Sequence, residues 1–298
     1  MRVEVVDSGL LRFADGTPVR AASAIAPYGD GWLIGQDDAT HACWWRDGIG
    51  SPVRVLPAVD GYEVFSEATG TKELKPDLEA AVAVDGGVLM LGSGSTPARM
   101  RVALVALGAD PVVGDLSPLY ARISGALGVA PDALNLEGAC VVGDHLRWFQ
   151  RGLPAAGVPT ASVDVELRRL LAALTGSDSG EDIPLGGVRH YDLRGARGLA
   201  LAVTDAVVLP DRRVLVSAAA EDSPNTYDDG PVLGSALAVL DGDVVVATVL
   251  LPEPDGRVAK VEGLALLEWG DLGGRVLATV DADDPEVPSA VLTLEVSL

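Results

Sequence analysis

A short motif recurs four times along this chain at nearly even spacing. In each copy an acidic residue precedes a small residue, and a run of apolar residues follows. The acids are Glu79, Glu137, Asp205 and Glu262, which lie 58, 68 and 57 residues apart. Residues 22–26 form a degenerate fifth copy, with Ser23 in place of the acid. A repeat of this length that holds several short apolar runs is typical of a β-propeller.

The apolar runs within each repeat are joined by turn sequences. Asp47-Gly48, Gly86-Gly87 and Asp241-Gly242 each separate two such runs, a pattern that predicts β-hairpins. The last repeat has only three runs, whereas residues 2–6 at the N-terminus read as a further strand. We therefore predict an all-β fold, a single propeller domain over residues 1–298. It has five blades, or six if the third repeat region is divided. The N-terminal strand closes the ring beside residues 291–297, which removes an open sheet edge.

Two segments depart from this strand pattern. Residues 117–123 begin Ser-Pro and carry apolar residues at helical spacing, which predicts a short helix with Ser117 at its cap. Leu167, Leu170, Leu171 and Leu174 show the same spacing within the third repeat.

The composition narrows the classes of partner. A net charge of −21 over 298 residues argues against nucleic acid or an anionic membrane surface as partner. The chain opens with no signal-like segment and has no apolar run long enough for a membrane span. Cys43 and Cys140 lie in apolar runs of different repeats, so we expect free thiols. We expect a cytoplasmic monomer that binds a small-molecule ligand or substrate.

The repeat also predicts a site. In a propeller, the start of each innermost strand and the loop between its second and third strands lie on the same face. We therefore expect Glu79, Glu137, Asp205 and Glu262 to surround one mouth of the central channel. The loops predicted to lie above them carry Asp37, Arg99, Arg151, Glu221, Asp222, Asp281 and Asp283.

Carboxylates brought together in this way repel one another, so a cation, nearby basic residues or protonation must offset the charge. Oxygen ligands favour Ca²⁺ or Mg²⁺, and the expected metal ligands are Glu137, Asp205 and Glu262. In the alternative, Lys75, Lys260, Arg99 and Arg151 neutralise the acids. The chain has only three lysines, and Lys75 and Lys260 both lie just before a repeat acid. The candidate catalytic residues are Glu79, Glu137, Lys75 and Lys260.

The Leu-Glu-Gly step followed by an apolar run resembles the bacterial phytase-like and gluconolactonase-like propellers. Residues 134–139, 204–210 and 217–222 more closely resemble an uncharacterised family of bacterial propellers. The gluconolactonase-like resemblance implies a divalent metal at the channel mouth, with Glu137 as the best-matching ligand. This chain differs in having acids where those families use Asn, and in having five expected blades where six are usual.

Three functions fit these observations. The first is a metal-dependent hydrolase of a small ester, lactone or phosphate. The second is a non-catalytic propeller that binds a ligand or a protein. The third is a glycosidase with a pair of carboxyl groups, for which an aromatic-lined groove would be the supporting observation.

Overall fold

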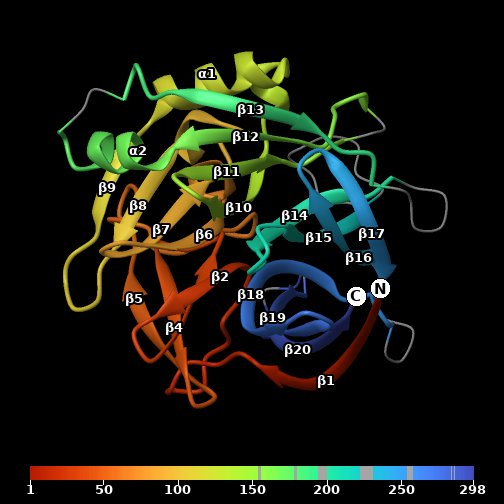
Figure 1. The fold of residues 1–298 in the computed structure, drawn as a ribbon. Coiled ribbons are helices and arrows are strands. Elements are labelled where there is room, and N and C mark those ends of the chain that lie inside the picture. The colour runs from red at the N-terminus through yellow and green to blue at the C-terminus, as the bar shows by residue number, and fades with distance from the viewer. Residues whose placement is uncertain are drawn as a thin grey trace.

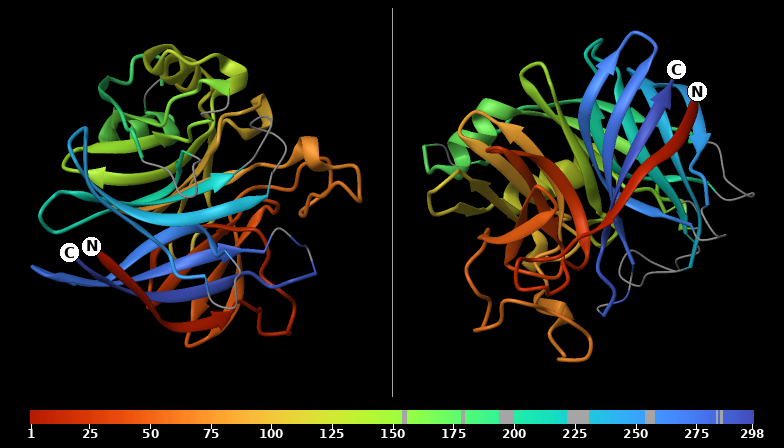
Figure 2. Two further views of the ribbon diagram at one scale, coloured as in Figure 1. Left: turned by 90° about the vertical axis from the view of Figure 1, so that its right-hand side faces the viewer. Right: turned by 90° about the horizontal axis from the view of Figure 1, so that it is seen from below.

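A computed structural model describes residues 1–153, 156–177, 180–193, 200–221, 231–253, 258–282, 284 and 286–298. Within these ranges the chain forms five four-stranded antiparallel sheets arranged in a ring (Figure 1, Figure 2). The predicted five-bladed β-propeller is confirmed.

Each blade is one sheet, whose strands follow one another from the centre of the ring outward. Blade 1 comprises β2 (Ala22–Tyr28), β3 (Gly31–Gln36), β4 (His41–Arg46) and β5 (Ile49–Arg54). Blade 2 comprises β6 (Leu78–Val84), β7 (Gly87–Gly92), β8 (Arg101–Val105) and β9 (Val112–Asp115). Blade 3 comprises β10 (Leu136–Val142), β11 (His145–Gln150), β12 (Ala161–Glu166) and β13 (Leu185–His190). Blade 4 comprises β14 (Ala202–Val208), β15 (Val214–Glu221), β16 (Val232–Asp241) and β17 (Val244–Leu250). Blade 5 comprises β18 (Lys260–Gly270), β19 (Gly273–Asp281), β20 (Ala290–Ser297) and β1 (Arg2–Leu10).

The N-terminal strand closes the ring, as the sequence predicts. β1 pairs antiparallel with β20 from Arg2 opposite Ser297 to Leu10 opposite Ala290. The two chain ends consequently lie side by side (Figure 1). The innermost strands β2, β6, β10, β14 and β18 contact one another in order, and β18 contacts β2 to complete the circle.

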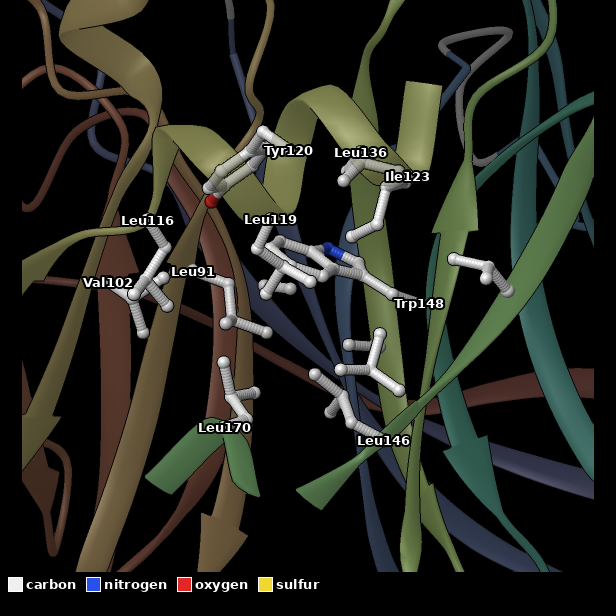
Figure 3. Close-up of a cluster of buried hydrophobic side chains, with 14 of the residues drawn as sticks. Leu91, Val102, Leu116, Leu119, Tyr120, Ile123, Leu136, Leu146, Trp148 and Leu170 are labelled. Carbon is white, nitrogen blue, oxygen red and sulfur yellow. The ribbon is translucent and has the colours of Figure 1, made fainter. Parts of the chain in front are cut away.

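Helices cover part of the core between blades 2 and 3. α1 (Ser117–Leu127) connects these two blades, and α2 (Leu167–Leu174) lies between β12 and β13. The rings of Tyr120 and Trp148 meet edge to face at 5.1 Å in a buried apolar cluster (Figure 3). Short 3₁₀ helices among the described residues include Lys72–Leu74, Pro97–Arg99 and Pro131–Ala133. None of the helices in the described ranges is long and apolar enough to cross a membrane.

Both predicted helices are present, but the prediction that Ser117 caps α1 is wrong. Leu116 occupies the cap position, and Ser117 is already helical. Asp115 Oδ1 accepts a hydrogen bond from the Ser117 amide at 2.9 Å, so Asp115 satisfies this free N–H group. Cys43 and Cys140 are buried free thiols, as expected.

Every innermost strand has a β-bulge near its start, and the bulge explains the sequence repeat. One extra residue enters the pairing with the second strand at Ser23, at Glu79, at Glu137-Gly138, at Thr204 and at Glu262. Bulges redirect a side chain and are common next to functional sites. The repeat acids of blades 2, 3 and 5 therefore sit at equivalent backbone positions.

Blade 4 does not follow the register expected from the sequence. Thr204, and not Asp205, occupies its bulge position. The residue after the bulge faces the next blade, where space is short. A Cβ on Gly138 would lie 2.6 Å from the Cα of Asp205, and one on Gly263 would lie 3.0 Å from backbone atoms of Ala24. Asp205 stands at this inter-blade position.

Candidate functional site

The starts of the innermost strands surround a cavity of about 590 Å³ at one end of the ring. The bulge residues Ser23, Glu79, Glu137 and Glu262 all contribute to its wall. The connection between blades 1 and 2 adds residues 65–68 and Lys72 at the rim. The backbone bulges thus carry the repeat acids into one cavity.

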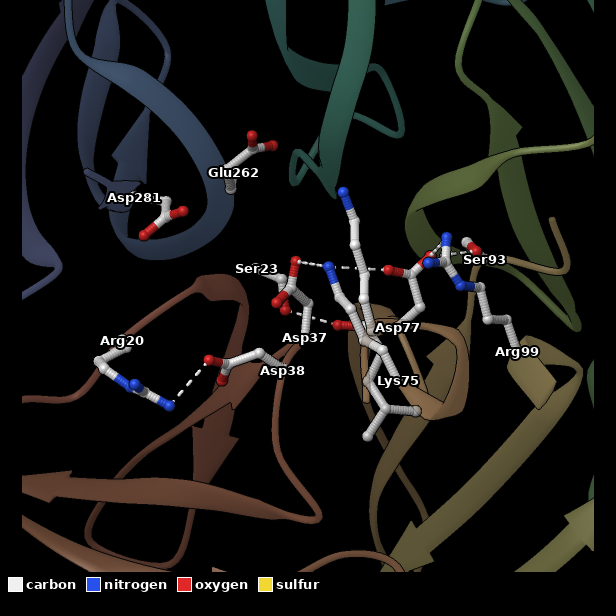
Figure 4. Close-up of polar contacts among 12 residues, drawn as sticks. Arg20, Ser23, Asp37, Asp38, Lys75, Asp77, Ser93, Arg99, Glu262 and Asp281 are labelled. Carbon is white, nitrogen blue, oxygen red and sulfur yellow. Dashed lines mark hydrogen bonds and ion pairs between the residues drawn. The ribbon is translucent and has the colours of Figure 1, made fainter. Parts of the chain in front are cut away.

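The first half of the site is a cluster that we call the Asp77 network, comprising Asp37, Lys75, Asp77, Glu79 and Arg99. The Lys75 ammonium lies between Asp37 Oδ2 at 2.5 Å and Asp77 Oδ1 at 3.0 Å (Figure 4). Arg99 Nη1 contacts Asp77 Oδ2 at 2.9 Å. Asp77 has a φ of 55°, in the left-handed region, which Asp adopts more readily than most non-glycine residues.

The second half is the Glu221 network, comprising Glu137, Arg151, Glu221, Lys260 and Glu262. Arg151 joins Glu137 Oε1 at 2.7 Å to Glu221 Oε2 at 2.5 Å. Lys260 joins Glu221 Oε1 at 3.1 Å to Glu262 Oε1 at 3.0 Å. Residues from blades 3, 4 and 5 are thereby linked across the channel mouth.

Two carboxyl groups in these networks are incompletely partnered. Glu137 Oε1 accepts hydrogen bonds from Asn135 Nδ2 and Arg151 Nη1, whereas its buried Oε2 has no partner among the described residues. Within the same ranges, no hydrogen bond or ion pair joins the Glu79 side chain to another residue. Both residues contribute to the cavity wall, and Glu137 Oε2 itself is buried beneath it.

Burial and neighbouring charges shift the pKa values in this site. Burial raises the pKa of Glu137 to about 8, and Arg151 opposes this shift while Glu262 adds to it. Burial also raises the pKa of Glu79 well above its usual value, with Asp77 and Asp37 adding to the effect. Burial, opposed by the charge of Lys75, raises the pKa of Asp37 to about 7. For Glu221, burial acts upward, but Arg151 and Lys260 outweigh it and lower the pKa to about 2.

Most of the residues predicted from the sequence converge here. The cavity wall includes Asp37, Lys75, Glu79, Arg99, Glu137, Arg151, Lys260, Glu262 and Asp281. Glu221 joins them through Arg151 and Lys260. The predictions for Asp222 and Asp283 lie outside the described residues.

Asp205 does not lie with the others, because the expected register in blade 4 is off by one residue. Its carboxylate is buried between blades 4 and 5, where Oδ2 accepts a hydrogen bond from the Leu264 amide at 2.7 Å. Thr204 takes the bulge position, and its hydroxyl donates to the Val261 carbonyl oxygen at 2.6 Å. Asp205 therefore links two blades rather than facing the cavity.

Two residues of the site escaped the sequence reasoning. Asp77 and Asn135 lie two residues before Glu79 and Glu137, and Lys260 stands in the same relation to Glu262. Asp77 holds Lys75 and Arg99, and Asn135 positions Glu137. The polar or charged residue two positions before each of these repeat acids is the sequence pattern that indicates them.

The predicted calcium ligands do not form a ligand set. Asp205 faces another blade, Glu137 Oε1 is bound by Asn135 and Arg151, and Glu262 is bound by Lys260. Among the described residues, Asp37, Asp77 and Glu79 bring one oxygen each within 4.8 Å of one another. The Lys75 ammonium already contacts two of these three acids. Since Ca²⁺ takes six to eight oxygen ligands, this arrangement fits an ammonium better than the metal.

Fold and site together define a β-propeller with a charged cavity at the channel mouth. The chain belongs to a family of unknown function, DUF6910, whose model matches residues 71–285. A search of functionally curated proteins finds no significant match.

Solved structures share the fold at low sequence identity. A hypothetical protein from Leishmania major superposes with a TM-score of 0.51 and 13% identity, covering 99% of this chain and 91% of its own. A candidate glycoside hydrolase from Parabacteroides distasonis has a TM-score of 0.51 and 11% identity, covering 93% of this chain and 86% of its own. At these identities, the matches establish the fold alone.

Proposed function

We propose that this protein is a hydrolase of a small ester, lactone or glycoside, and that Glu137 is its general acid. The observation that carries this proposal is the state of the Glu137 carboxyl group. Its Oε1 accepts two hydrogen bonds, while its buried Oε2 has no partner among the described residues. Since Oε1 already accepts two hydrogen bonds, a proton on this carboxyl group is carried by Oε2.

The neighbouring groups support a complete acid–base cycle. Burial raises the pKa of Glu137 to about 8, so the group is protonated at neutral pH. Asp37 also lines the cavity. Burial raises the pKa of Asp37 to about 7, although the charge of Lys75 opposes this shift, and a pKa near 7 suits a general base. Water attacks the substrate carbon and gives a proton to Asp37, the carbon–oxygen bond breaks, and the leaving oxygen takes the proton of Glu137. Exchange with solvent returns both groups to their starting states.

The cavity lining favours compact substrates. Phe65 is the one aromatic side chain among the described residues that line the cavity, so the aromatic groove expected of a glycosidase is not formed by them. Because the described residues form no aromatic groove, a small ester or lactone ranks above an oligosaccharide as the substrate.

The Parabacteroides distasonis protein, described as a candidate glycoside hydrolase, has the same fold and supports the proposal by analogy of fold alone.

The test is a turnover screen with nitrophenyl esters, lactones and nitrophenyl glycosides, without added metal. Glu137→Gln keeps the shape of the side chain and removes the transferable proton, so kcat should fall by about 10²–10⁴-fold. Glu268→Gln, an exposed carboxyl group on β18 remote from the cavity residues, is the matched control and should retain activity. No turnover of any substrate by the wild-type protein would contradict the proposal and favour the alternative, a non-catalytic binding propeller.

A further inference from the structure

We propose that Gln150 is a positioning residue for Glu137, because it fixes the two segments whose side chains bind Glu137 Oε1. Gln150 is fully buried and does not line the cavity, so it acts on a ligand only through other residues. The kinetic consequences of this inference rest on the proposed function, whereas the contacts that carry it are independent of any reaction.

The side-chain amide of Gln150 bonds to the backbone of two segments. Its Oε1 accepts a hydrogen bond from the Asn135 N–H group at 2.9 Å. Its Nε2 donates to the carbonyl oxygens of Ala133 at 3.1 Å and of Arg151 at 2.7 Å. These bonds fix the orientation of the amide, because the reverse orientation would place its oxygen against two carbonyl oxygens. The Arg151 N–H group also donates to the Asn135 carbonyl oxygen at 2.8 Å, so the two segments are joined directly as well.

The side chains of the same two segments hold the carboxyl group of Glu137. Asn135 Nδ2 donates to Glu137 Oε1 at 2.9 Å, and Arg151 Nη1 donates to the same oxygen at 2.7 Å. The orientation of the Glu137 carboxyl group therefore depends on the relative position of the two segments. A displacement of about 1 Å in a reacting group can lower the rate by about 10²-fold.

The placement of glutamine along the chain is the second argument. The chain contains only two glutamines, Gln36 and Gln150, and each is the last residue of the second strand of a blade. Gln36 pairs with Ala22, and Gln150 pairs with Leu136, which are the first residues of their innermost strands. At the equivalent paired position the other three blades have Gly92, Ala219 and Asp281.

Gln36 makes corresponding contacts in blade 1. Its Oε1 accepts a hydrogen bond from the Arg20 N–H group at 3.0 Å, and its Nε2 donates to the His41 carbonyl oxygen at 3.1 Å. The second bond closes the loop that carries Asp37, the proposed general base. The two glutamines thus support the two blades whose residues exchange protons with the substrate in the proposed reaction.

The side-chain amide signals of the protein give a test that needs no substrate. The chain has two Asn and two Gln residues, so few such signals appear in a ¹H–¹⁵N spectrum, and Asn135→Ala identifies the pair of Asn135 by its loss. Gln150→Met keeps the length of the side chain and removes its hydrogen bonds. In this variant the Asn135 pair should shift and exchange faster with solvent than in the wild type. Gln36→Met is the matched variant and should leave the Asn135 pair unchanged.

Turnover of a substrate found in the screen measures the effect on catalysis. Gln150→Met should lower kcat by about 10–100-fold with little change in KM, because it displaces a group that acts in the transition state. In a Glu137→Gln background the same substitution should have no further effect on kcat, since the group that Gln150 positions is already lost. Gln150→Glu keeps the acceptor for the Asn135 N–H group and removes the donors. It should show the same effects and provides a second variant should Gln150→Met fail to fold.

Two results would overturn the inference. The first is an Asn135 pair with the same shift and exchange rate in the Gln150 variants as in the wild type. The second is an equal fall in kcat with and without Glu137→Gln, which would mean that Gln150 only stabilises the fold. A wild-type protein without turnover would instead contradict the proposed function, and the amide signals would still decide whether Gln150 fixes Asn135.

Discussion

Glu137 and Glu221 share the same arginine, yet their pKa values shift in opposite directions. Glu221 contacts two cations, Arg151 and Lys260, and these outweigh the effect of its burial. Glu137 contacts Arg151 alone, and its second donor is the neutral amide of Asn135. The number of cations within contact therefore decides which carboxyl group is ionised in the cavity and which keeps a proton.

This difference predicts how stability depends on pH. The pKa of Glu137 rises from 4.5 to about 8 on folding, so between these values the folded chain holds a proton that the unfolded chain has released. The free energy of unfolding should therefore fall as pH rises from about 4.5 to about 8, by up to about 1.4 kcal/mol per pH unit from this group. Urea unfolding across this range measures the slope, which Glu137→Gln should reduce. An equal slope in the variant would show that Glu137 is not the titrating group.

Lys75 provides a second prediction at the residue scale, which also tests for a metal. Lys75→Met leaves Asp37, Asp77 and Glu79 together without their shared cation, so the free energy of unfolding should fall by about 3–5 kcal/mol. Ca²⁺ should then restore part of the melting temperature, because three carboxyl groups converge there. Lys72→Met, which removes a contact to the exposed Glu67, is the control and should cost about 0–1 kcal/mol. The wild-type melting temperature should respond neither to Ca²⁺ nor to a chelator; a fall on chelation would restore the metal hypothesis.

At the scale of the elements, the β-bulge is the unit that repeats. The bulge residue either sends an acid into the cavity, as Glu79, Glu137 and Glu262 do, or bonds to the next blade. Ser23 donates to the Leu78 carbonyl oxygen at 2.5 Å, and Thr204 makes the equivalent bond in blade 4. In blades 1 and 4 the bulge residue therefore has a hydroxyl group in place of the acid, and its hydrogen bond joins two neighbouring innermost strands.

The bulge also explains which parts of the site the sequence could predict. The hairpin turns predict the strands of each blade and the closure of the ring. The repeat motif predicts the acids of blades 2, 3 and 5, because this motif coincides with the bulge in each of these blades. The sequence pattern predicts Asp205 as the site residue because Asp205 is acidic, like Glu79, Glu137 and Glu262. The backbone register instead places Thr204 at the bulge position. Asp77 and Asn135 were missed because their roles depend on contacts with side chains far along the chain, such as Arg99 and Arg151. Local patterns do not contain that information.

The residue after the bulge gives a prediction at this scale. In Gly138→Ala, the new Cβ would lie 2.6 Å from the Cα of Asp205, and this backbone cannot move without shifting blade 4. The free energy of unfolding should fall by about 1–3 kcal/mol in a urea titration. Gly125→Ala is the matched control, since no atom lies within 4 Å of its Cβ position in α1, and it should stabilise by about 0.5–1 kcal/mol. Equal stability of Gly138→Ala and the wild type would rule out close inter-blade packing at this bulge.

At the scale of the whole molecule, the ring is held by strands from the two ends of the chain. Without β1, blade 5 would end at β20, whose backbone would become an open edge. The innermost strands contact one another around the full circle, so weakening one blade removes support from both neighbours. The cavity draws its wall from blades 1, 2, 3 and 5, and its geometry therefore depends on closure.

Deleting residues 1–10 should lower the melting temperature of the whole protein and promote self-association through the β20 edge. Scanning calorimetry measures the first effect, and size-exclusion chromatography with light scattering measures the second.

Two substitutions in β1 test whether its buried side chains, rather than its sequence as such, stabilise the ring. Val3→Asp places a charge at a position only 8% exposed and should act like the deletion, whereas Val6→Asp, at 47% exposed, should be nearly neutral. Because Val3 packs in the apolar cluster shared by blades 4 and 5, its loss should also reduce ligand or substrate binding at the distant cavity. A deletion variant with the same oligomeric state and the same melting temperature as the wild type would mean that β1 is not needed to close the ring.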